Sequence, residues 1–153
     1  MKNEIIVEEM INYYKNNKYY TISNHVAYLE PISNKKNISV MGINNPSPRY
    51  NNNKISTHAE INVLQKLSRK MILYHKKKMV VNLYVIKIDK EGNLKNSKPC
   101  KHCCIEMSKN KKININKIFF SNEFGEIESH YFNSWYKENL NHISYGWLCF
   151  REN

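Results

Sequence analysis

Two short stretches constrain this chain more than any other feature: residues 57–60, which read Thr-His-Ala-Glu, and residues 99–103, which read Pro-Cys-Lys-His-Cys. Pro99 is favourable in the first turn of a helix, because an N–H at that position has no intrahelical partner to lose. Cys100 and Cys103 are three residues apart, so on one helical turn both thiols point to the same side, toward one metal ion. A helix N-terminus also lowers the pKa of a thiol and so favours the thiolate that binds metal.

Residues 57–60 supply the third ligand and the carboxylate that the two thiols lack. His58, at the start of a second predicted helix, offers a neutral imidazole as the third ligand. Three protein ligands leave the fourth position of tetrahedral zinc for water, which is typical of a catalytic rather than a structural site. Glu60, two residues further on, is then predicted to handle protons beside the metal.

Two alternatives to a catalytic site stay open from the residues alone. Thr57 and Glu60 have the spacing of a capping box, in which the carboxylate folds back to the backbone N–H of the capping residue. Such a box explains Thr57 and Glu60 but leaves His58 unexplained. A closed structural zinc site is the second alternative, and it would recruit a fourth ligand such as Cys104 or Cys149.

The pairing of His-x-Glu with Pro-Cys-x-x-Cys resembles the zinc-dependent cytidine/deoxycytidylate deaminase superfamily. A second element, Gly42-x-Asn44-x-Pro46, is similar to a G-x-N-x-P pattern of tRNA adenosine deaminases. Residues 92–103 match G-x-L-x-N-S-x-P-C-x-x-C, which looks like an uncharacterised branch of the deaminase-like families. The resemblance runs from about residue 26 to residue 121, and its specific part is these motif residues.

The resemblance implies one zinc ion per chain, held by His58, Cys100 and Cys103. It also implies that a water ionised by zinc and Glu60 attacks the ring carbon that bears an amino group on a pyrimidine or purine. Metal activation brings the pKa of a bound water from about 15.7 to roughly 7. Glu60 would then pass the proton to the departing amine, which leaves as ammonia.

Three further residues are candidates for substrate contacts. The resemblance implies that the Asn44 side chain touches the sugar or base, although Asn-Asn-Pro by itself is ordinary turn chemistry. The backbone N–H of Ala59 would orient the substrate together with Asn44. The carbonyl of Lys98 would accept a hydrogen bond from the reacting amine.

The substrate class stays open between two enzymatic interpretations and a non-catalytic one. The expected substrate is a nucleoside or nucleotide of cytidine or deoxycytidylate type, since the chain is small and has no appended RNA-binding domain. A polynucleotide (tRNA, RNA or single-stranded DNA) is the alternative that the net charge of +11 favours. A deaminase-like fold that only holds structural zinc or binds nucleic acid is the third. A composition rich in Lys, Asn, Ile and Tyr also follows from AT-rich coding DNA.

Length and composition fit one deaminase-like domain over residues 1–153. Hydrophobic residues make up 41% of the chain, which is normal for a globular protein, and no apolar run approaches the roughly 20 residues that span a membrane. Residues 1–4 begin no apolar signal block, so we expect a cytoplasmic protein without a membrane partner. The sequence leaves the oligomeric state open, and the resemblance allows a homo-oligomer because members of this superfamily often form dimers or tetramers.

The periodicity of apolar residues predicts a three-layer α/β/α sandwich with a mixed sheet of about five strands, as the resemblance also does. Residues 79–88 are a continuous apolar run typical of a central strand covered on both faces. The other predicted elements are a helix over 4–16, a hairpin of strands 26–32 and 38–41, helices over 58–75 and 100–109, a strand around 118–120, a helix over 132–140 and a short final strand within 142–150.

Overall fold

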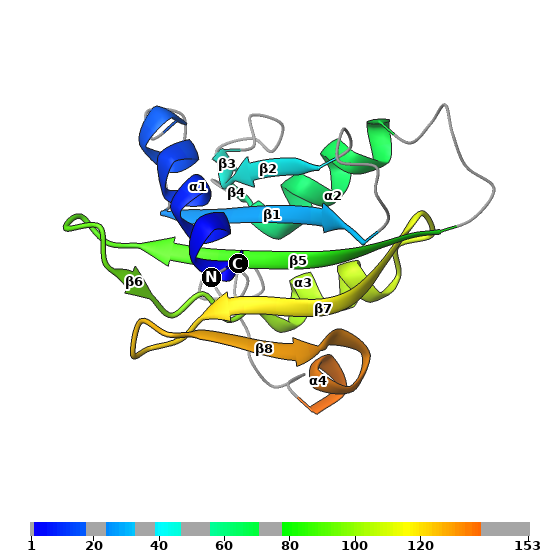
Figure 1. Cartoon of the computed structure of the whole chain (residues 1–153). Helices are drawn as coiled ribbons and strands as arrows, with labels where there is room; N and C mark the ends of the chain where they lie inside the picture. Colours follow the sequence, from blue (N-terminus) through cyan, green and yellow to red (C-terminus); the bar gives the residue numbers. More distant parts are fainter. Residues whose placement is uncertain (1, 18–23, 33–38, 47–55, 71–77, 139–153) are drawn as a thin grey trace, which may run out of the picture.

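The computed structural model describes residues 2–17, 24–32, 39–46, 56–70 and 78–138 (Figure 1). In chain order the elements are α1 (Lys2–Asn17), β1 (His25–Pro31), β2 (Val40–Ile43), β3 (Asn45–Pro46), β4 (Ser56–Thr57), α2 (Ala59–Lys70), β5 (Met79–Ile88), β6 (Leu94–Lys95), α3 (Lys101–Ser108), β7 (Ile113–Ser121), β8 (Ile127–Tyr131) and α4 (Phe132–Glu138). None of these described helices combines the length and the apolar character needed to cross a bilayer.

The main sheet is mixed and open, with strand order β2-β1-β5-β7-β8 and the short β6 paired to the end of β5. β5 and β7 run parallel, while the β1–β2, β1–β5 and β7–β8 pairs are antiparallel. The two-residue strands β3 and β4 pair with each other in a separate ribbon. The predicted mixed sheet is therefore confirmed, and so is the hairpin formed by β1 and β2.

The central strand β5 is buried on both faces, as its apolar run predicts. Val81, Leu83 and Val85 belong to one hydrophobic cluster, and Ile86 and Ile88 belong to the cluster on the other side. Because side chains alternate between the two faces of a strand, a polar residue every second position would have left one face open to water. The apolar run thus fixes β5 as the layer between two cores.

Helices cover both faces of the sheet, which makes the three layers visible in Figure 1. Ile6 and Met10 of α1 pack into the same cluster as Val26 of β1, and α1 contacts β1, β2 and β5. The other cluster joins α2, α3 and α4 to the opposite face, through residues such as Leu67 and Met107. The predicted α/β/α sandwich is confirmed.

The strand β8 was not expected from the sequence. Its middle residues, Glu128, Ser129 and His130, lack the apolar alternation that marks a half-buried strand. β8 exists because it extends the sheet by pairing with β7 after a turn at Gly125, whose φ of +77° suits glycine. The end of the predicted helix 58–75, the residue Leu140 and the predicted final strand at 142–150 lie outside the described residues.

Gly42 occupies a point where β2 and α2 approach too closely for a side chain. A Cβ there would lie 2.8 Å from Val63 Cγ1 and 3.2 Å from Asn62 Nδ2. Val63 is fully buried and β-branched, so it has little freedom to move away. We expect Gly42→Ala to lower the free energy of unfolding by about 1–3 kcal/mol, measured by urea denaturation. Unchanged stability would contradict this close approach.

Candidate metal centre

The end of β2 fixes the start of α2, where His58 lies. The His58 carbonyl accepts the first helical hydrogen bond, from the Asn62 N–H at 2.9 Å. Asn44 Oδ1 accepts the Ala59 N–H at 2.8 Å, and the Asn62 side-chain amide donates to the Ile43 carbonyl at 2.7 Å. These buried hydrogen bonds hold the first turn of α2 against the sheet, so the imidazole of His58 projects from an anchored position.

Cys100 is the capping residue of α3 and has extended backbone geometry, with φ −76° and ψ 164°. Its carbonyl accepts the Cys104 N–H at 3.0 Å, but its side chain makes no capping hydrogen bond. Cys103 lies one turn further along and is fully buried. The N-terminus of α3 thus presents both thiols to one side, as the Cys-x-x-Cys spacing predicts.

A buried hydroxyl pair anchors the segment that leads into Cys100. Ser97 Oγ donates to the Val85 carbonyl at 2.7 Å and accepts the Ser121 N–H at 2.9 Å. The Ser97 N–H donates to the Ser121 carbonyl at 2.8 Å, and Ser121 Oγ donates to the Lys95 carbonyl at 2.6 Å. Ser97 therefore ties the residues before Pro99 to the carboxyl ends of β5 and β7. Ser97 is part of the sequence motif over residues 92–103, but the motif does not indicate this anchoring role.

We expect Ser97→Ala to lower the free energy of unfolding by about 1–3 kcal/mol, because it leaves buried backbone groups of Val85 and Ser121 without a partner. Metal affinity should fall as well, since the segment before Cys100 loses its anchor. Chemical denaturation and a competition titration with a chromophoric chelator measure the two effects. Ser108→Ala is the control, because Ser108 is exposed and bonds only locally, to the Ile105 carbonyl. Equal effects of the two substitutions would contradict the anchoring role.

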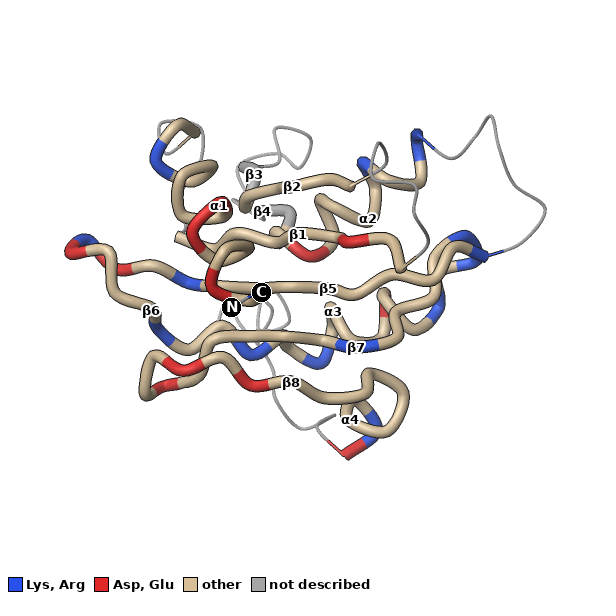
Figure 2. Tube along the Cα trace, viewed as in Figure 1, with Lys and Arg blue, Asp and Glu red and all other residues tan. Residues whose placement is uncertain are grey.

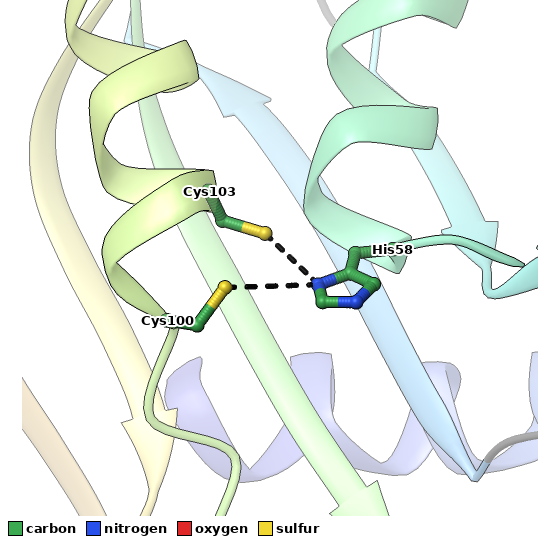
Figure 3. A group of neighbouring side chains, drawn as sticks. All are labelled: His58, Cys100 and Cys103. Carbon is green, nitrogen blue, oxygen red and sulfur yellow. Dashed lines mark hydrogen bonds between the residues drawn. The ribbon is translucent and has the colours of Figure 1, made fainter. Parts of the chain in front are cut away.

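The three predicted ligands come together between α2 and α3 (Figure 3). His58 Nδ1 lies 3.1 Å from Cys103 Sγ and 3.9 Å from Cys100 Sγ, and the three ligand atoms all lie within 4.8 Å of one another. Zinc bonds of about 2.0 Å to nitrogen and 2.3 Å to sulfur, at tetrahedral angles, place such atoms roughly 3.5–3.8 Å apart. The donor set and its spacing therefore fit a tetrahedral metal ion that prefers nitrogen and sulfur.

The pKa values of the two thiols are shifted in opposite directions. A hydrogen bond from Cys103, and a further one from His58, lower the pKa of Cys100 to about 3. The pKa of Cys103 is raised well above its usual value, first by its hydrogen bond to Cys100 and then by burial. Cys100 is thus a thiolate at neutral pH and Cys103 a thiol. Metal binding has to displace the Cys103 proton, since the thiolate is the metal-binding form.

Glu60 lies beside this group but contributes no atom to it. Its side chain is 4% exposed, and burial raises the pKa of its carboxyl group, while the neighbouring His58 opposes that shift. The capping-box alternative does not fit the helix register. Because His58 holds the capping position of α2, Thr57 lies one residue too early for a box with Glu60. The carboxyl group is instead buried beside His58 and accepts a hydrogen bond from its own backbone N–H.

The predicted substrate contacts have other partners in this structure. The Ala59 N–H and the Asn44 side chain, both expected to orient a substrate, are hydrogen-bonded to each other at 2.8 Å. Lys98 lies just before Pro99, and its N–H donates to Asn96 Oδ1 at 3.1 Å. Their roles toward a substrate stay predictions, whereas Asn44 has a clear structural role at the start of α2.

Of the two cysteines named as possible fourth ligands, only Cys104 belongs to the described residues. Cys104 is buried, and its Sγ lies 3.9 Å from the Pro99 carbonyl, outside the group of ligand atoms. Burial raises the pKa of the Cys104 thiol to about 12, so it stays neutral. Cys149 lies outside the described residues. Within the described parts of the chain, three side chains converge on the candidate metal position.

His25 is a neighbour of the centre that no motif in the sequence indicates, although it is one of several histidines that could approach a pocket. It is the first residue of β1, and burial lowers its pKa to about 4, with smaller contributions from Lys87 and His58. His25 is therefore neutral at physiological pH. Only the topology brings it here, because the start of β1 lies at the carboxyl end of β5 in an antiparallel pair.

A hollow of about 620 Å³ lies on the same side of the sheet, along β8 and α4. Lys98, two residues before Cys100, lines it, whereas His58, Cys100, Cys103 and Glu60 do not. His130 lines it too and lies 3.2 Å from a carboxylate oxygen of Glu128. The hollow therefore adjoins the segment that carries Cys100, and it is separate from the metal group.

No protein-family model and no curated protein sequence matches this chain. The centre is thus defined by its own geometry: one imidazole and two thiols that can hold a metal ion, on an α/β sandwich with a mixed sheet.

Proposed function

We propose that this protein is a zinc-dependent hydrolytic deaminase of a nucleobase in a nucleoside or nucleotide, of cytidine or deoxycytidylate type. The observation that carries the proposal is a buried carboxyl group next to three convergent ligands. Three ligands leave one corner of a tetrahedral zinc ion open, which distinguishes catalytic from structural sites. A closed structural site gives no role to a carboxyl group that is buried beside His58 and is not itself a ligand, whereas a catalytic site does.

Metal binding and proton transfer are proposed for different side chains of the centre. His58, Cys100 and Cys103 hold the metal, which when bound lowers the pKa of water from about 15.7 to roughly 7. Glu60 accepts the proton that leaves the attacking water and transfers it to the ring amine. The C–N bond to that amine then breaks and ammonia departs, while the remaining proton of the added hydroxyl passes to the adjacent ring nitrogen and leaves a carbonyl group on the ring. Burial suits Glu60 to this task, because it brings a carboxyl pKa closer to the operating pH.

Asn44, Ala59 and Lys98 are the proposed substrate contacts. A contact by the Ala59 N–H requires it to exchange its present hydrogen bond to Asn44. The Lys98 carbonyl would accept a hydrogen bond from the reacting amine, since it immediately precedes Pro99 and Cys100 in the segment that Ser97 anchors.

The test is ammonia release from a panel of cytidine, deoxycytidine, their monophosphates, adenosine, and single-stranded DNA and RNA. Purified protein loaded with one equivalent of zinc is used, and the Cys103→Ser protein serves as the blank. The proposal expects release from a cytosine nucleoside or nucleotide. Release from polynucleotides alone would replace this substrate class by the polynucleotide alternative. No release from any member, with zinc bound, would contradict a deaminase.

A further inference from the structure

Lysine side chains gather at the end of the molecule where β5 and β7 begin. Lys78 directly precedes β5, and Lys109, Lys111 and Lys112 lie in the turn between α3 and β7. The Met79 N–H donates to the Lys112 carbonyl at 2.9 Å, and Met79 is the register partner of Ile113. The two lysine segments are therefore side by side in space although about thirty residues separate them. We call Lys78, Lys109, Lys111 and Lys112 the basic end.

The lysines of the basic end are exposed and form no salt bridge with another described residue. All four lysines are exposed, and the salt bridges found among the described residues involve other cations, Lys2, Lys95 and His130. The last turn of α2 carries two further basic residues, Arg69 and Lys70. Asp and Glu positions (red in Figure 2) instead lie in the turns after β5 and β7, at the opposite end of these strands, with a lysine among those of the first turn. Among the described residues, basic and acidic positions therefore mark opposite ends of β5 and β7.

The turn that carries these lysines is held by hydrogen bonds. Asn110 Oδ1 accepts the N–H groups of Lys112 and Ile113, each at 2.9 Å, and the Asn110 N–H donates to the Met107 carbonyl at 3.4 Å. Because its backbone is fixed in this way, the turn presents its ammonium groups from one anchored surface. A bound polyanion would then order only the lysine side chains.

We propose that the basic end binds the sugar–phosphate backbone of single-stranded nucleic acid. Clustered, unpaired lysines release counterions from phosphates on contact, which is the source of sequence-independent affinity. Exposed Asn114, the register partner of Val80, adds an amide beside the lysines that can bond a phosphate or sugar oxygen. The preference for a single strand goes beyond the proposed nucleotide substrate and rests only on the proposed deaminase chemistry, because a nucleobase in a duplex has to leave the stack before it reaches a buried centre.

The position of the basic end fits a strand that also reaches the metal centre. Cys100 and Cys103 lie at the N-terminus of α3, and the lysine turn lies at its C-terminus. The eight residues of α3 span about 12 Å. A strand bound along this side would therefore present a base to the centre from a phosphate contact only a few nucleotides away.

The test compares two triple variants that change the net charge equally. Lys109→Glu/Lys111→Glu/Lys112→Glu alters the basic end, and Lys15→Glu/Lys90→Glu/Lys137→Glu alters three exposed lysines on other elements. Binding of a fluorescein-labelled single-stranded DNA of mixed sequence, and of the matching RNA, is followed by anisotropy between about 50 and 200 mM salt. Thermal melting checks that both variants are folded.

We expect wild type to bind, with affinity falling steeply as salt rises. The basic-end variant should bind at least tenfold more weakly, and its log–log salt slope should be shallower by about 2, from roughly 0.7 for each lost phosphate contact. The control variant should lose much less. Equal loss in both variants would show that net charge alone acts and would overturn the proposal. Three other results would also overturn it. The first is no binding of the strand by wild type, and the second is tighter binding of a duplex of the same sequence. The third is equally good binding of vesicles of phosphatidylserine through the basic end.

The ammonia panel separates this inference from the proposed function. If the basic end binds the strand and no panel substrate releases ammonia, the deaminase proposal fails while the binding surface stands.

Discussion

Replacing Glu60 with Gln is expected to abolish ammonia release while the metal stays bound. Glu60 contributes no atom to the three-ligand group, so the bound zinc should remain at one equivalent. The neutral amide fills the same volume but cannot accept and return a proton. Loss of a general acid–base group typically costs about 10²–10⁴-fold in rate. Ammonia release and zinc content, measured on the same preparation, give the two halves of the result.

Glu106→Gln is the matched control for this substitution. Glu106 lies on α3 near the centre in sequence, but its side chain is exposed. The same loss of one carboxylate there should leave both rate and zinc content at wild-type values. A Glu60→Gln protein that still releases ammonia at the wild-type rate would remove Glu60 from the mechanism. One that loses its zinc would instead make Glu60 a support for the metal.

Replacing Cys103 with Ser is expected to have the largest effect on metal binding. Cys103 is fully buried, and its Sγ lies 3.1 Å from His58 Nδ1. A hydroxyl at this position is a poor ligand for zinc compared with a thiolate. The loss in affinity should exceed the 10–100-fold that removal of an outer-shell partner typically costs. Zinc retained after dialysis against a chelator measures it.

Cys104→Ser provides a control on the adjacent residue of the same helix. Cys104 is also buried, but its thiol lies outside the ligand group. Its variant should keep its zinc and lose only some stability. Zinc at a hundredfold excess over its dissociation constant stabilises the folded state by about 2.7 kcal/mol. A chelator should therefore lower the melting temperature of wild type and of Cys104→Ser, and leave that of Cys103→Ser unchanged. Equal zinc retention by both variants would contradict the assigned ligands.

The candidate site was more predictable from sequence than its surroundings, because its chemistry is encoded at short spacing. Cys100 and Cys103 share one helical turn, so their common direction follows from helix geometry alone. That His58 meets them depends on the topology, since β5 separates α2 from α3 along the chain. The resemblance to a deaminase signature supplied that contact as an expectation, and the distances between ligand atoms agree with it.

Other parts depended on contacts that no local pattern carries. Ser97 and Asn44 look like ordinary loop residues, and only the folded chain brings them to their buried partners, Ser121 at the end of β7 and Ala59 at the start of α2. β8 is polar because it lies at the edge of the sheet, where pairing with β7 rather than burial determines its structure. The central strand β5 is the opposite case, since burial on both faces leaves an apolar run that predicts it directly.

The most direct test of the account is the coordination sphere of the bound metal, measured by X-ray absorption at the zinc edge together with the zinc content. The account predicts one zinc per chain with two sulfur ligands at about 2.3 Å, one imidazole nitrogen at about 2.0 Å and one exchangeable oxygen ligand. Three or four sulfur ligands, or a fourth protein side chain in place of the oxygen, would make the site structural and contradict the proposed chemistry.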